Sequence, residues 1–384
     1  MNFTLTEEQL AVKEAARDFA QNELLPGVIE RDNLQQFPTD QVKMMGELGF
    51  LGMMVDPKYG GGGMDSMSYV LAMEEISKVD NSCSVIMSVN NSLVCWGLET
   101  FGTEDQKQKY LTKLATGEWI GSFCLSEPEA GSDATSQRTT AEDKGDYYLL
   151  NGTKNWITSG GSSRVHLVIA QTDRELGHKG INAFIVETGW DGVEIGAKED
   201  KLGIRSSDTH TIMYNDVKVP KANRIGENGF GFKFAMKVLS GGRIGIASQA
   251  LGIAAGAYEL AVKYAQERSA FGKPISKHQA IAFKVADMAV DIEAARLLVY
   301  RSAWLKDNHL PYDQASSMAK LHASSVAMKH TVEAVQIHGG YGFVKEYHVE
   351  RLMRDAKITQ IYEGTSEVQK IVISRNVFKG NLQV

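Results

Sequence analysis

The sequence predicts a multi-domain α+β protein in which an all-helical N-terminal domain and a C-terminal four-helix bundle flank a middle β-barrel or sheet domain. Its 384 residues suffice for two to three domains of ordinary size. Apolar residues recur at helical spacing in the first and last thirds, whereas the middle third holds short runs of β-branched residues. The expected domains are residues 1–118, 119–228 and 229–384.

Helix signals fill the N-terminal domain. Thr6 and Gln9 have the spacing of a capping box, and helix-forming residues follow as far as Leu24. Further helices are expected over Thr39–Leu48, Met67–Lys78, Asn81–Leu98 and Thr103–Ala115. The uncharged stretch Asn81–Leu98 carries several Ser and Asn side chains that would be costly in lipid, so we expect a helix buried in protein and no membrane span.

Strand signals mark the middle domain. The segment Tyr147–Thr158 has Asn151-Gly152 at its centre, which predicts a β-hairpin with a tight turn there. Further strands are expected over Val165–Ala170, Ile181–Val186 and Thr209–Val219.

Four long helices are predicted for the C-terminal domain. Ile281, Val285, Met288 and Ile292 form one apolar stripe at helical spacing. The four expected helices are Phe230–Arg268, Lys277–Lys306, Pro311–Ile337 and Ser366–Phe378, separated by breaks at residues 271–274 and 339–342.

Composition and simple motifs exclude several functions. A net charge of −6 without a cluster of Lys and Arg argues against nucleic-acid binding. The three cysteines form no C-x-x-C pair, so we expect neither disulfides nor zinc, and the chain suits the reducing cytoplasm. The N-terminus has acidic Glu7 and Glu8 instead of the basic and apolar regions of a signal peptide. No dinucleotide fingerprint, phosphate loop, metal-binding helix or nucleophile elbow is present.

Three histidines tempt a metal hypothesis. His322, His330 and His338 follow one another at steps of eight residues, each of which turns a helix by about 80°. The three rings therefore cannot converge on one ion, and no metal site is expected.

Three stretches have a composition suited to a ligand. Phe123–Asp133 combines small hydroxyls with glycine, which lets backbone N–H groups approach a polar ring or a pyrophosphate, although a plain Ser/Asp-rich turn reads the same way. In Trp156–Gly161 an indole and a hydroxyl, Trp156 and Thr158, share one side of a strand and could hold a flat cofactor. A core tryptophan is the alternative.

The third stretch, Gln360–Gln369, contains a candidate base. Ser366 and Gln369 have capping-box spacing, which places Glu363 in a loop just before the last helix. Glu363 could simply complement the helix dipole, or it could be a general base whose pKa is set by burial. The glycine that follows it would let a substrate come close.

Taken in order, these stretches resemble the acyl-CoA dehydrogenase family over essentially the whole length, most closely its short-chain, butyryl-CoA type. The text that carries the resemblance is LSEPEAGSD, NWITSGG, GGRIGIASQALGIA, ERSAFGKPI, QIHGGYG and RDAKITQIYEGTSEVQ. The resemblance implies an FAD enzyme that converts a short-chain acyl-CoA to the trans-2-enoyl-CoA. A carboxylate removes the α-proton, and the β-hydrogen leaves as hydride to the flavin.

The resemblance also implies roles for individual residues. Glu363 is the base, and its backbone N–H is one donor to the thioester carbonyl. Some relatives carry the carboxylate at the position of Gly242, which glycine cannot replace. The residues implied in FAD binding are Leu125, Ser126, Trp156, Thr158, Arg268, Phe271, Gln279, Gln336, Gly340, Thr365 and Glu367, in part across a subunit boundary. Those implied on the substrate side are Ser132, Ser240, Arg243, Tyr362 and Gly364.

Two residues depart from the family pattern. Phe123 stands where many relatives have tyrosine, which removes a hydroxyl. Ser240 stands where many have aspartate, which puts the usual polar contact to CoA in doubt.

The implied partners are a short-chain acyl-CoA, an electron-transferring flavoprotein and further copies of the chain in a homotetramer built as a dimer of dimers. Three alternatives stay open at this stage. The acyl group could be branched, the enzyme could be an oxidase or monooxygenase of the same fold, or the chain could be a helical scaffold without chemistry. The last would be expected to lack the base, and Glu363 is present.

Overall fold

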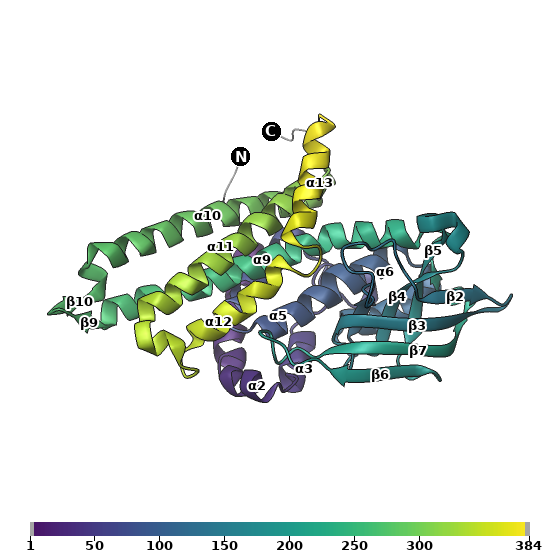
Figure 1. Cartoon of the computed structure of the whole chain (residues 1–384), viewed down its shortest axis with the longest axis horizontal. Helices are drawn as coiled ribbons and strands as arrows, with labels where there is room; N and C mark the ends of the chain where they lie inside the picture. Colours follow the sequence, from purple (N-terminus) through teal and green to yellow (C-terminus); the bar gives the residue numbers. More distant parts are fainter. Residues whose placement is uncertain (1–3, 381–384) are drawn as a thin grey trace.

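The structure is a computed structural model that describes residues 4–380. It confirms the predicted fold class, with helices at both ends of the chain around a middle β-sheet (Figure 1). The first three residues of the predicted N-terminal domain and the last four of the C-terminal domain lie outside the described residues. The same holds for the first residues of the segment in which no signal peptide is predicted.

The N-terminal helices are short and closely packed. They are α1 (Glu7–Phe19), α2 (Val28–Leu34), α3 (Thr39–Glu47), α4 (Ser66–Ser77), α5 (Asn81–Ser88), α6 (Trp96–Phe101), α7 (Glu104–Gln106) and α8 (Thr112–Ala115). The capping box at the start of α1 is confirmed, because Thr6 Oγ1 accepts from Gln9 N and the Gln9 side chain accepts from Thr6 N.

The uncharged stretch Asn81–Leu98 is buried inside the protein, as predicted. It runs through α5, a π-helical segment Val89–Cys95 and the start of α6. Two of its polar side chains bond main-chain groups: Asn90 donates to the carbonyls of Leu51 and Leu114, and Asn91 donates to that of Phe50. Burial without this pairing would be costly.

The middle of the chain forms one eight-stranded sheet. Its strands are β1 (Gly121–Cys124), β2 (Thr140–Asp143), β3 (Tyr147–Thr158), β4 (Val165–Gln171), β5 (Ile181–Glu187), β6 (Val193–Lys198), β7 (Thr209–Pro220) and β8 (Arg224–Ile225). The order is β6-β7-β3-β2-β4-β5-β8, with β1 paired to β4. The strands predicted over residues 165–170, 181–186 and 209–219 are therefore confirmed.

The hairpin predicted at Asn151-Gly152 is wrong. Tyr147–Thr158 is one continuous strand, β3, which pairs antiparallel with β7 and changes register between Leu150 and Gly152. Asn151 bonds Asp216 across the strands instead of turning the chain, with its Nδ2 donating to Asp216 Oδ1 at 2.9 Å. Gly152 has φ 148° and lies against Thr139, so the glycine allows a bulge where strands approach closely.

The C-terminal helices are α9 (Gly231–Glu267), α10 (Gln279–Asp307), α11 (Asp313–His338), α12 (His348–Ala356) and α13 (Ser366–Phe378). The four predicted helices are confirmed to within three residues at each end, and α12 is an addition. A small hairpin of β9 (Ser269–Ala270) and β10 (Lys273–Pro274) joins α9 to α10. α13 leaves the other helices at an angle (Figure 1).

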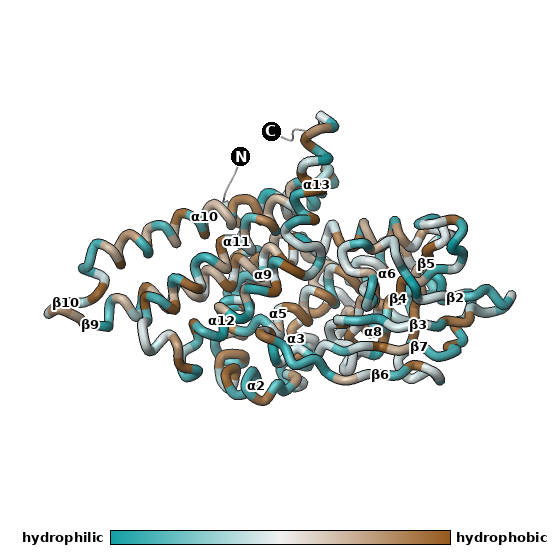
Figure 2. The backbone as a smooth tube through the Cα atoms, in the orientation of Figure 1, coloured by the Kyte–Doolittle hydropathy of each residue, from teal (hydrophilic) through white to brown (hydrophobic). Residues whose placement is uncertain are grey.

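α9 is the central helix of the fold. It is long and apolar enough to cross a membrane, but 83% of its most apolar window is buried inside the protein. Figure 2 shows hydrophobic residues along α9 where it passes through the middle of the molecule. α9 is therefore a core helix of the fold.

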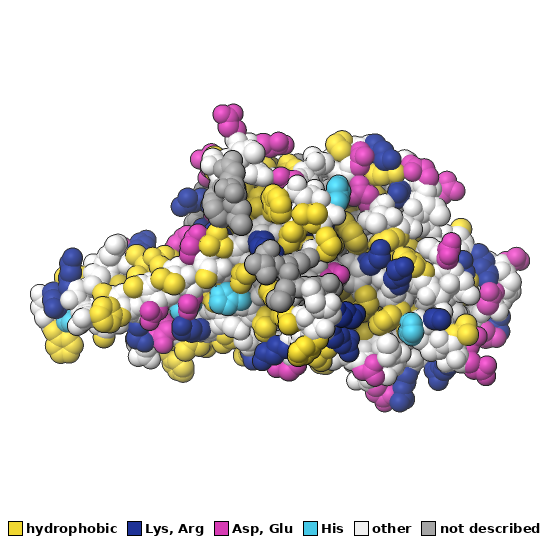
Figure 3. Space-filling view, turned by 90° about the horizontal axis from the view of Figure 1, so that it is seen from above, with side chains coloured by type: hydrophobic (Ala, Val, Ile, Leu, Met, Phe, Trp, Pro, Cys, Tyr) yellow, Lys and Arg dark blue, Asp and Glu magenta, His cyan; other side chains and the backbone are white. Residues whose placement is uncertain are grey.

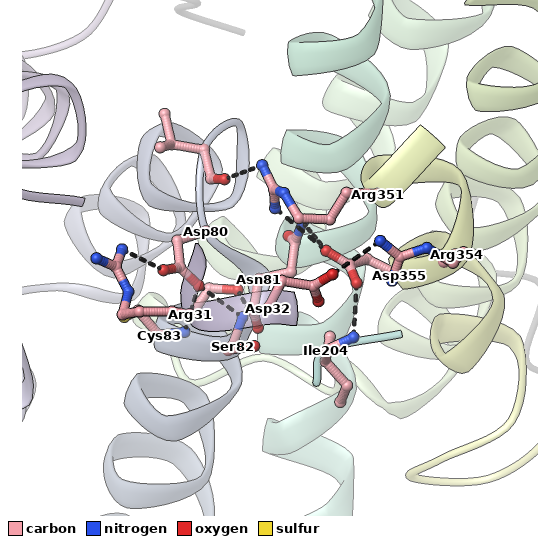
Figure 4. A network of polar contacts seen from close by, with 12 residues as sticks. Arg31, Asp32, Asp80, Asn81, Ser82, Cys83, Ile204, Arg351, Arg354 and Asp355 are labelled. Atoms are coloured by element: carbon pink, nitrogen blue, oxygen red, sulfur yellow. Dashed lines mark hydrogen bonds and ion pairs between the residues drawn. The ribbon is translucent and has the colours of Figure 1, made fainter. Parts of the chain in front are cut away.

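A buried polar network joins the three parts of the chain (Figure 4). Asp355 at the end of α12 accepts from Asn81 Nδ2 at 3.1 Å and from Ile204 N, in the middle part, at 2.6 Å. Arg351 pairs with the same carboxylate at 3.4 Å, and nearby Arg354 pairs with Asp32 at 2.8 Å. Burial raises the pKa of Asp355 to about 6. The network fixes α5 and α12, which both lead toward the site described next.

Candidate active site

Glu363 lies in the loop between the 3-10 turn Lys357–Gln360 and α13. Its backbone is left-handed, with φ 53°, and Gly364 follows at φ 95°. The N-cap of α13 is Thr365, whose Oγ1 accepts from Val368 N at 3.3 Å. The predicted capping box of Ser366 and Gln369 is therefore wrong. The Gln369 side chain instead donates to the carbonyls of Glu363 and Gly364, which shapes the loop that carries the carboxylate.

The carboxylate of Glu363 points into the protein. Its Oε2 atom is buried and has no hydrogen-bond partner within residues 4–380. It lies against Gly242 of α9, close to Leu93 of the π-helical segment. Burial raises the pKa of Glu363 to about 7, while the nearby charges of Lys320 and Arg243 act in the opposite direction. An unpaired carboxylate with such a pKa suits proton transfer near neutral pH.

The backbone N–H of Glu363 is also without an acceptor in the described part of the chain. The N–H of the preceding residue, Tyr362, is used, because it donates to the carbonyl of Ile358 at 3.1 Å. A free donor beside a free carboxylate is the pair of groups that polarising and deprotonating a carbonyl compound requires.

Two buried cations flank the carboxylate. Arg243 of α9 is 6% exposed, and its Nη1 donates to Ser317 Oγ at 3.3 Å. Lys320 of α11 is 1% exposed, and its Nζ donates to the carbonyls of Thr359 and Gly364. Sequence reasoning found Arg243 but missed Lys320. A lysine whose neighbours one turn away are all small, Ser316, Ser317, Ala323 and Ser324, was the available signal.

α9 runs past the Glu363 carboxylate. Gly242 faces the carboxylate, Gly245 faces the hydroxyls of Tyr69 and Ser88, and Gln249 accepts from the Tyr362 hydroxyl. These three positions are spaced by about one helical turn each. The Tyr362 hydroxyl is therefore held by a side chain of α9. Burial raises the pKa of Tyr362 well above the usual range. Ser240 bonds its own helix, at the carbonyl of Met236, with an Oγ–O distance of 3.1 Å.

A second group of predicted residues meets at the ends of β1 and β3. Leu125 and Ser126 follow β1, and the carbonyl of Ser126 accepts from Asn155 N at 2.9 Å, one residue before Trp156. Trp156 has φ 62° and is 62% exposed, so it is not a core tryptophan. Thr158 is half-buried, and its hydroxyl is unused among residues 4–380. An exposed indole two residues from a free hydroxyl fits a flat ring system that accepts a hydrogen bond.

Sequence reasoning missed the residue that holds this group together. Lys154 is fully buried, and its Nζ donates to the Leu125 carbonyl at 3.0 Å, to Glu127 at 2.7 Å and to Gln137 at 2.6 Å. Glu127 in turn accepts from the backbone of Arg138 and Thr139. Ser132 lies exposed in the loop that these contacts anchor. Phe123 is half-buried and packs toward Phe234, with ring centroids 6.4 Å apart.

A third group lies at the far end of the helices. Arg268 and Gly340 line a groove of about 550 Å³, together with Tyr264, Ile275, His338 and Tyr341. Phe271 is 96% exposed in the turn of the β9–β10 hairpin. Gln279 at the start of α10 and Gln336 near the end of α11 are exposed as well. Figure 1 places this hairpin at one end of the molecule and β3 in the other half. One chain therefore does not bring the two predicted parts of the FAD site together.

Two further predicted residues lie at the start of α13. Thr365 caps α13, and Glu367 is exposed in its first turn. The histidines do not share a ligand: His330 bonds Asp291, His338 bonds the carbonyl of Ala334, and residues 4–380 contain no cluster of three potential metal ligands.

Comparisons with known proteins agree with this architecture. Three family models match in order: "Acyl-CoA dehydrogenase, N-terminal domain" over residues 6–118, the middle domain over 122–217 and the C-terminal domain over 229–378. The chain is 52% identical over 379 residues to "Acyl-CoA dehydrogenase, short-chain specific" of Clostridium acetobutylicum, covering 99% of this chain and 100% of the relative.

Two solved structures are similarly close. Butyryl-CoA dehydrogenase from Megasphaera elsdenii is 48% identical with a TM-score of 0.97, covering 98% of this chain and 100% of that one. A chain of the structure described as "Electron transferring flavoprotein of Acidaminococcus fermentans: Towards a mechanism of flavin-based electron bifurcation" is 51% identical with a TM-score of 0.98, covering 99% and 100%.

Proposed function

The chain belongs to the acyl-CoA dehydrogenase family, and from that premise we propose that it desaturates a short-chain acyl-CoA, with Glu363 as the base. The observation that carries the proposal is the buried Oε2 of Glu363, which has no partner, beside an unused Glu363 N–H. No other described carboxylate combines these two features with a loop position between two buried cations.

FAD is the cofactor of this family, and when bound it accepts the β-hydrogen of the substrate as hydride. The residues that would hold its ring are Leu125, Ser126, Trp156 and Thr158. The exposed indole and the free hydroxyl support that assignment. Lys154 keeps the segment in place from behind.

The groups of this chain account for the removal of the α-proton. The Glu363 N–H donates to the thioester carbonyl and stabilises the negative charge that develops on its oxygen. The Glu363 carboxylate then takes the proton from the α-carbon. Arg243 and Lys320 hold positive charge next to the site, which favours the ionised form of the base before reaction.

The close contacts along α9 support a short acyl chain. From Gly242, which faces the base, to Gly245, which faces the Tyr69 hydroxyl, the helix rises by only about 4.5 Å. Gln249 and the Tyr362 hydroxyl close the same side about one turn further on. A butyryl group extends only two carbons beyond its α-carbon, which matches this short interval along the helix. Branched groups of four or five carbons are the alternative that the substrate titration below separates.

The split of the predicted FAD residues supports assembly. The groove at Arg268 and Gly340 lies at the C-terminal end of α9. At the N-terminal end of the same helix, Gly231 packs on Asn182 and Ala183 of β5. Thirty-seven helical residues span about 55 Å. We therefore assign Arg268, Phe271, Gln279, Gln336 and Gly340 to the FAD of a second copy, with Thr365 and Glu367 next to the same cofactor.

The surface of α10 supports a homotetramer. Phe283, Val290, Leu297 and Trp304 are 60%, 69%, 45% and 53% exposed and recur every seven residues. Such spacing places apolar side chains on one helix face, where they suit packing against another helix. Figure 3 shows hydrophobic side chains along the elongated part of the molecule that the long C-terminal helices form.

Three further assignments complete the proposal. Electron-transferring flavoprotein is the electron acceptor, Ser132 lies beside the CoA pantetheine or pyrophosphate, Gly364 contacts the substrate, and the protein works in the cytoplasm. The three buried free cysteines suit a reducing compartment. The domain boundaries at 118/119 and 228/229 stay a prediction.

The variant Glu363→Gln tests the base directly. It should retain FAD and bind butyryl-CoA, yet lose at least about 1,000-fold in the rate of flavin reduction, because only the proton acceptor changes. Glu346→Gln, at an exposed glutamate, is the matched control and should reduce normally. Normal reduction in Glu363→Gln would remove Glu363 as the base.

A further inference from the structure

Lys320 is the one described lysine that binds the loop of the proposed base. Its Nζ lies 3.1 Å from the carbonyl oxygen of Thr359 and 2.7 Å from that of Gly364. These carbonyls stand on either side of Glu363. Lys320 is 1% exposed and forms no ion pair with a carboxylate within residues 4–380. Burying an ammonium group is costly, and here it bonds only two main-chain carbonyls, so its position requires an explanation.

The conformation of the loop explains why a buried lysine binds there. Glu363 and Gly364 are consecutive left-handed residues, which is a costly backbone for glutamate and persists only where the surroundings impose it. Gln369 holds the loop from α13, with its Nε2 at 3.3 Å from the Glu363 carbonyl and 2.9 Å from the Gly364 carbonyl. Lys320 holds it from α11. Together the two helices bind three carbonyl groups of this segment, and both bind the carbonyl of Gly364.

We propose that Lys320 is the positioning residue of the base: by tying the carbonyls of Thr359 and Gly364 to α11, it holds Glu363 left-handed with its carboxylate toward Gly242 and its N–H free. The catalytic role of Glu363 in this proposal rests on the proposed function, whereas the contacts of Lys320 with the loop do not depend on it. Lys320 touches neither substrate nor cofactor in this role, and it acts only through Glu363.

The charge of Lys320 has a second effect on the same carboxylate. The titratable and charged groups that face Glu363 are Lys320 from α11, Arg243 from α9, Tyr69 from α4 and the adjacent Tyr362. Only the two cations favour its ionised form. Burial lowers the pKa of Lys320 to about 8, and the Glu363 carboxylate partly offsets this. Loss of the ammonium should therefore raise the pKa of Glu363 above its value of about 7.

Arg243 provides an internal comparison. It is also buried and close to Glu363, but its guanidinium bonds Ser317 and not the loop. Charge and position are therefore separable: both cations affect ionisation of the base, whereas only Lys320 fixes its geometry.

The experiment compares Lys320→Met with Lys320→Arg in the FAD-loaded protein. Lys320→Met should lower the rate of flavin reduction by butyryl-CoA about 100-fold, with little change in substrate affinity, because a displaced base reacts poorly. The acid limb of its pH profile should move upward by about one pH unit. Lys320→Arg keeps the charge and the donors, so its acid limb should stay at the wild-type position.

Lys306→Met is the matched control. Burial also lowers the pKa of Lys306 to about 8, but this lysine contacts Met54 and lies outside the loop. Its removal should change neither the rate nor the acid limb. If Lys320→Met behaved like this control, with both properties unchanged, Lys320 would be a structural lysine only and the proposal would be overturned.

A second readout needs no substrate. Infrared difference spectra between each protein and its Glu363→Gln version report the protonation of Glu363 alone. Its midpoint should rise in Lys320→Met and not in Lys320→Arg, and equal midpoints in all proteins would overturn the proposal. Should Lys320→Met fail to fold, the pH profile of Lys320→Arg decides, because a shifted acid limb there contradicts it. Failure of every acyl-CoA to reduce wild-type flavin would instead refute the proposed function and leave the infrared test intact.

Discussion

Gly242 of α9 and Glu363 of the loop before α13 occupy one space: a Cβ atom at position 242 would collide with Glu363 Oε2. The glycine therefore leaves room for the base that the loop supplies. A carboxylate on α9 at this position and one at Glu363 would compete for the same volume. The geometry explains why a single base at Glu363 goes with glycine at 242.

Gly242→Ala should displace the carboxylate. Its methyl group would overlap Glu363 Oε2 and approach Leu93 Cδ2 at 2.6 Å. We expect the flavin-reduction rate to fall about 100-fold with FAD content unchanged, because the base is moved and not removed. Gly241→Ala is the control, since its Cβ would meet nothing closer than 3.9 Å. Equal rates in the two variants would show that the collision is relieved without moving the base.

The pKa of Glu363 predicts a pH-dependent stability. The folded protein holds this proton up to a pKa of about 7, whereas the unfolded chain releases it near 4.5. As pH rises through that window, the folded state loses stability relative to the unfolded state. Glu363→Gln does not titrate, so it should be more stable than wild type above pH 7, by at most about 3 kcal/mol, and the difference should vanish near pH 4.5.

Urea unfolding of both FAD-loaded proteins at pH 5 and pH 8 measures this difference. Glu346→Gln corrects for the loss of an exposed charge. A stability difference that is equal at the two pH values would show that Glu363 is ionised throughout.

Much of the fold could be predicted because the spacing of apolar residues along the sequence reflects which side of a helix or strand is buried. The long helices and most strands follow from the spacing of apolar residues. The hairpin predicted at Asn151-Gly152 does not form, because β3 pairs with β7 and Asn151 bonds Asp216. Both contacts are with residues far away in the sequence, so a local turn signal does not report them. The Gln369 side chain was likewise assigned to a helix cap, while tertiary structure uses it to hold the Glu363 loop.

The site was predicted in part for a related reason. The base and the residues expected around the flavin follow from recognisable stretches of sequence. The supporting lysines do not: Lys154 and Lys320 act on carbonyls 29 and 39–44 residues away in the chain. A lysine in a sequence reads as surface, and only packing shows that these two are buried.

Trp156→Ala tests the cofactor role of the exposed indole. Because Trp156 is 62% exposed, its removal leaves no core cavity and should cost less than about 1 kcal/mol of folding stability. FAD should dissociate at least about 10-fold more readily, since one wall of its ring is lost. Flavin fluorescence after dilution measures the release. Unchanged retention would separate Trp156 from the flavin site.

The stripe on α10 predicts the assembly state. Leu297→Glu places a charge within the face of Phe283, Val290 and Trp304, where burial against another copy would be costly. Light scattering should show a mass below that of four chains, and FAD retention should fall with it because the cofactor site is shared. Leu176→Glu, at a leucine 53% exposed in the middle of the chain, is the control. A tetramer that survives Leu297→Glu would exclude this face from the interface.

The central claim is most directly tested by anaerobic titration of the FAD-loaded protein with butyryl-CoA, followed by longer and branched acyl-CoAs. The account predicts that butyryl-CoA bleaches the flavin band first, that reduction is lost in Glu363→Gln, and that air reoxidises the reduced flavin only slowly. A flavin that no acyl-CoA bleaches would contradict the proposed substrate class. Rapid turnover with oxygen would point instead to an oxidase of the same fold.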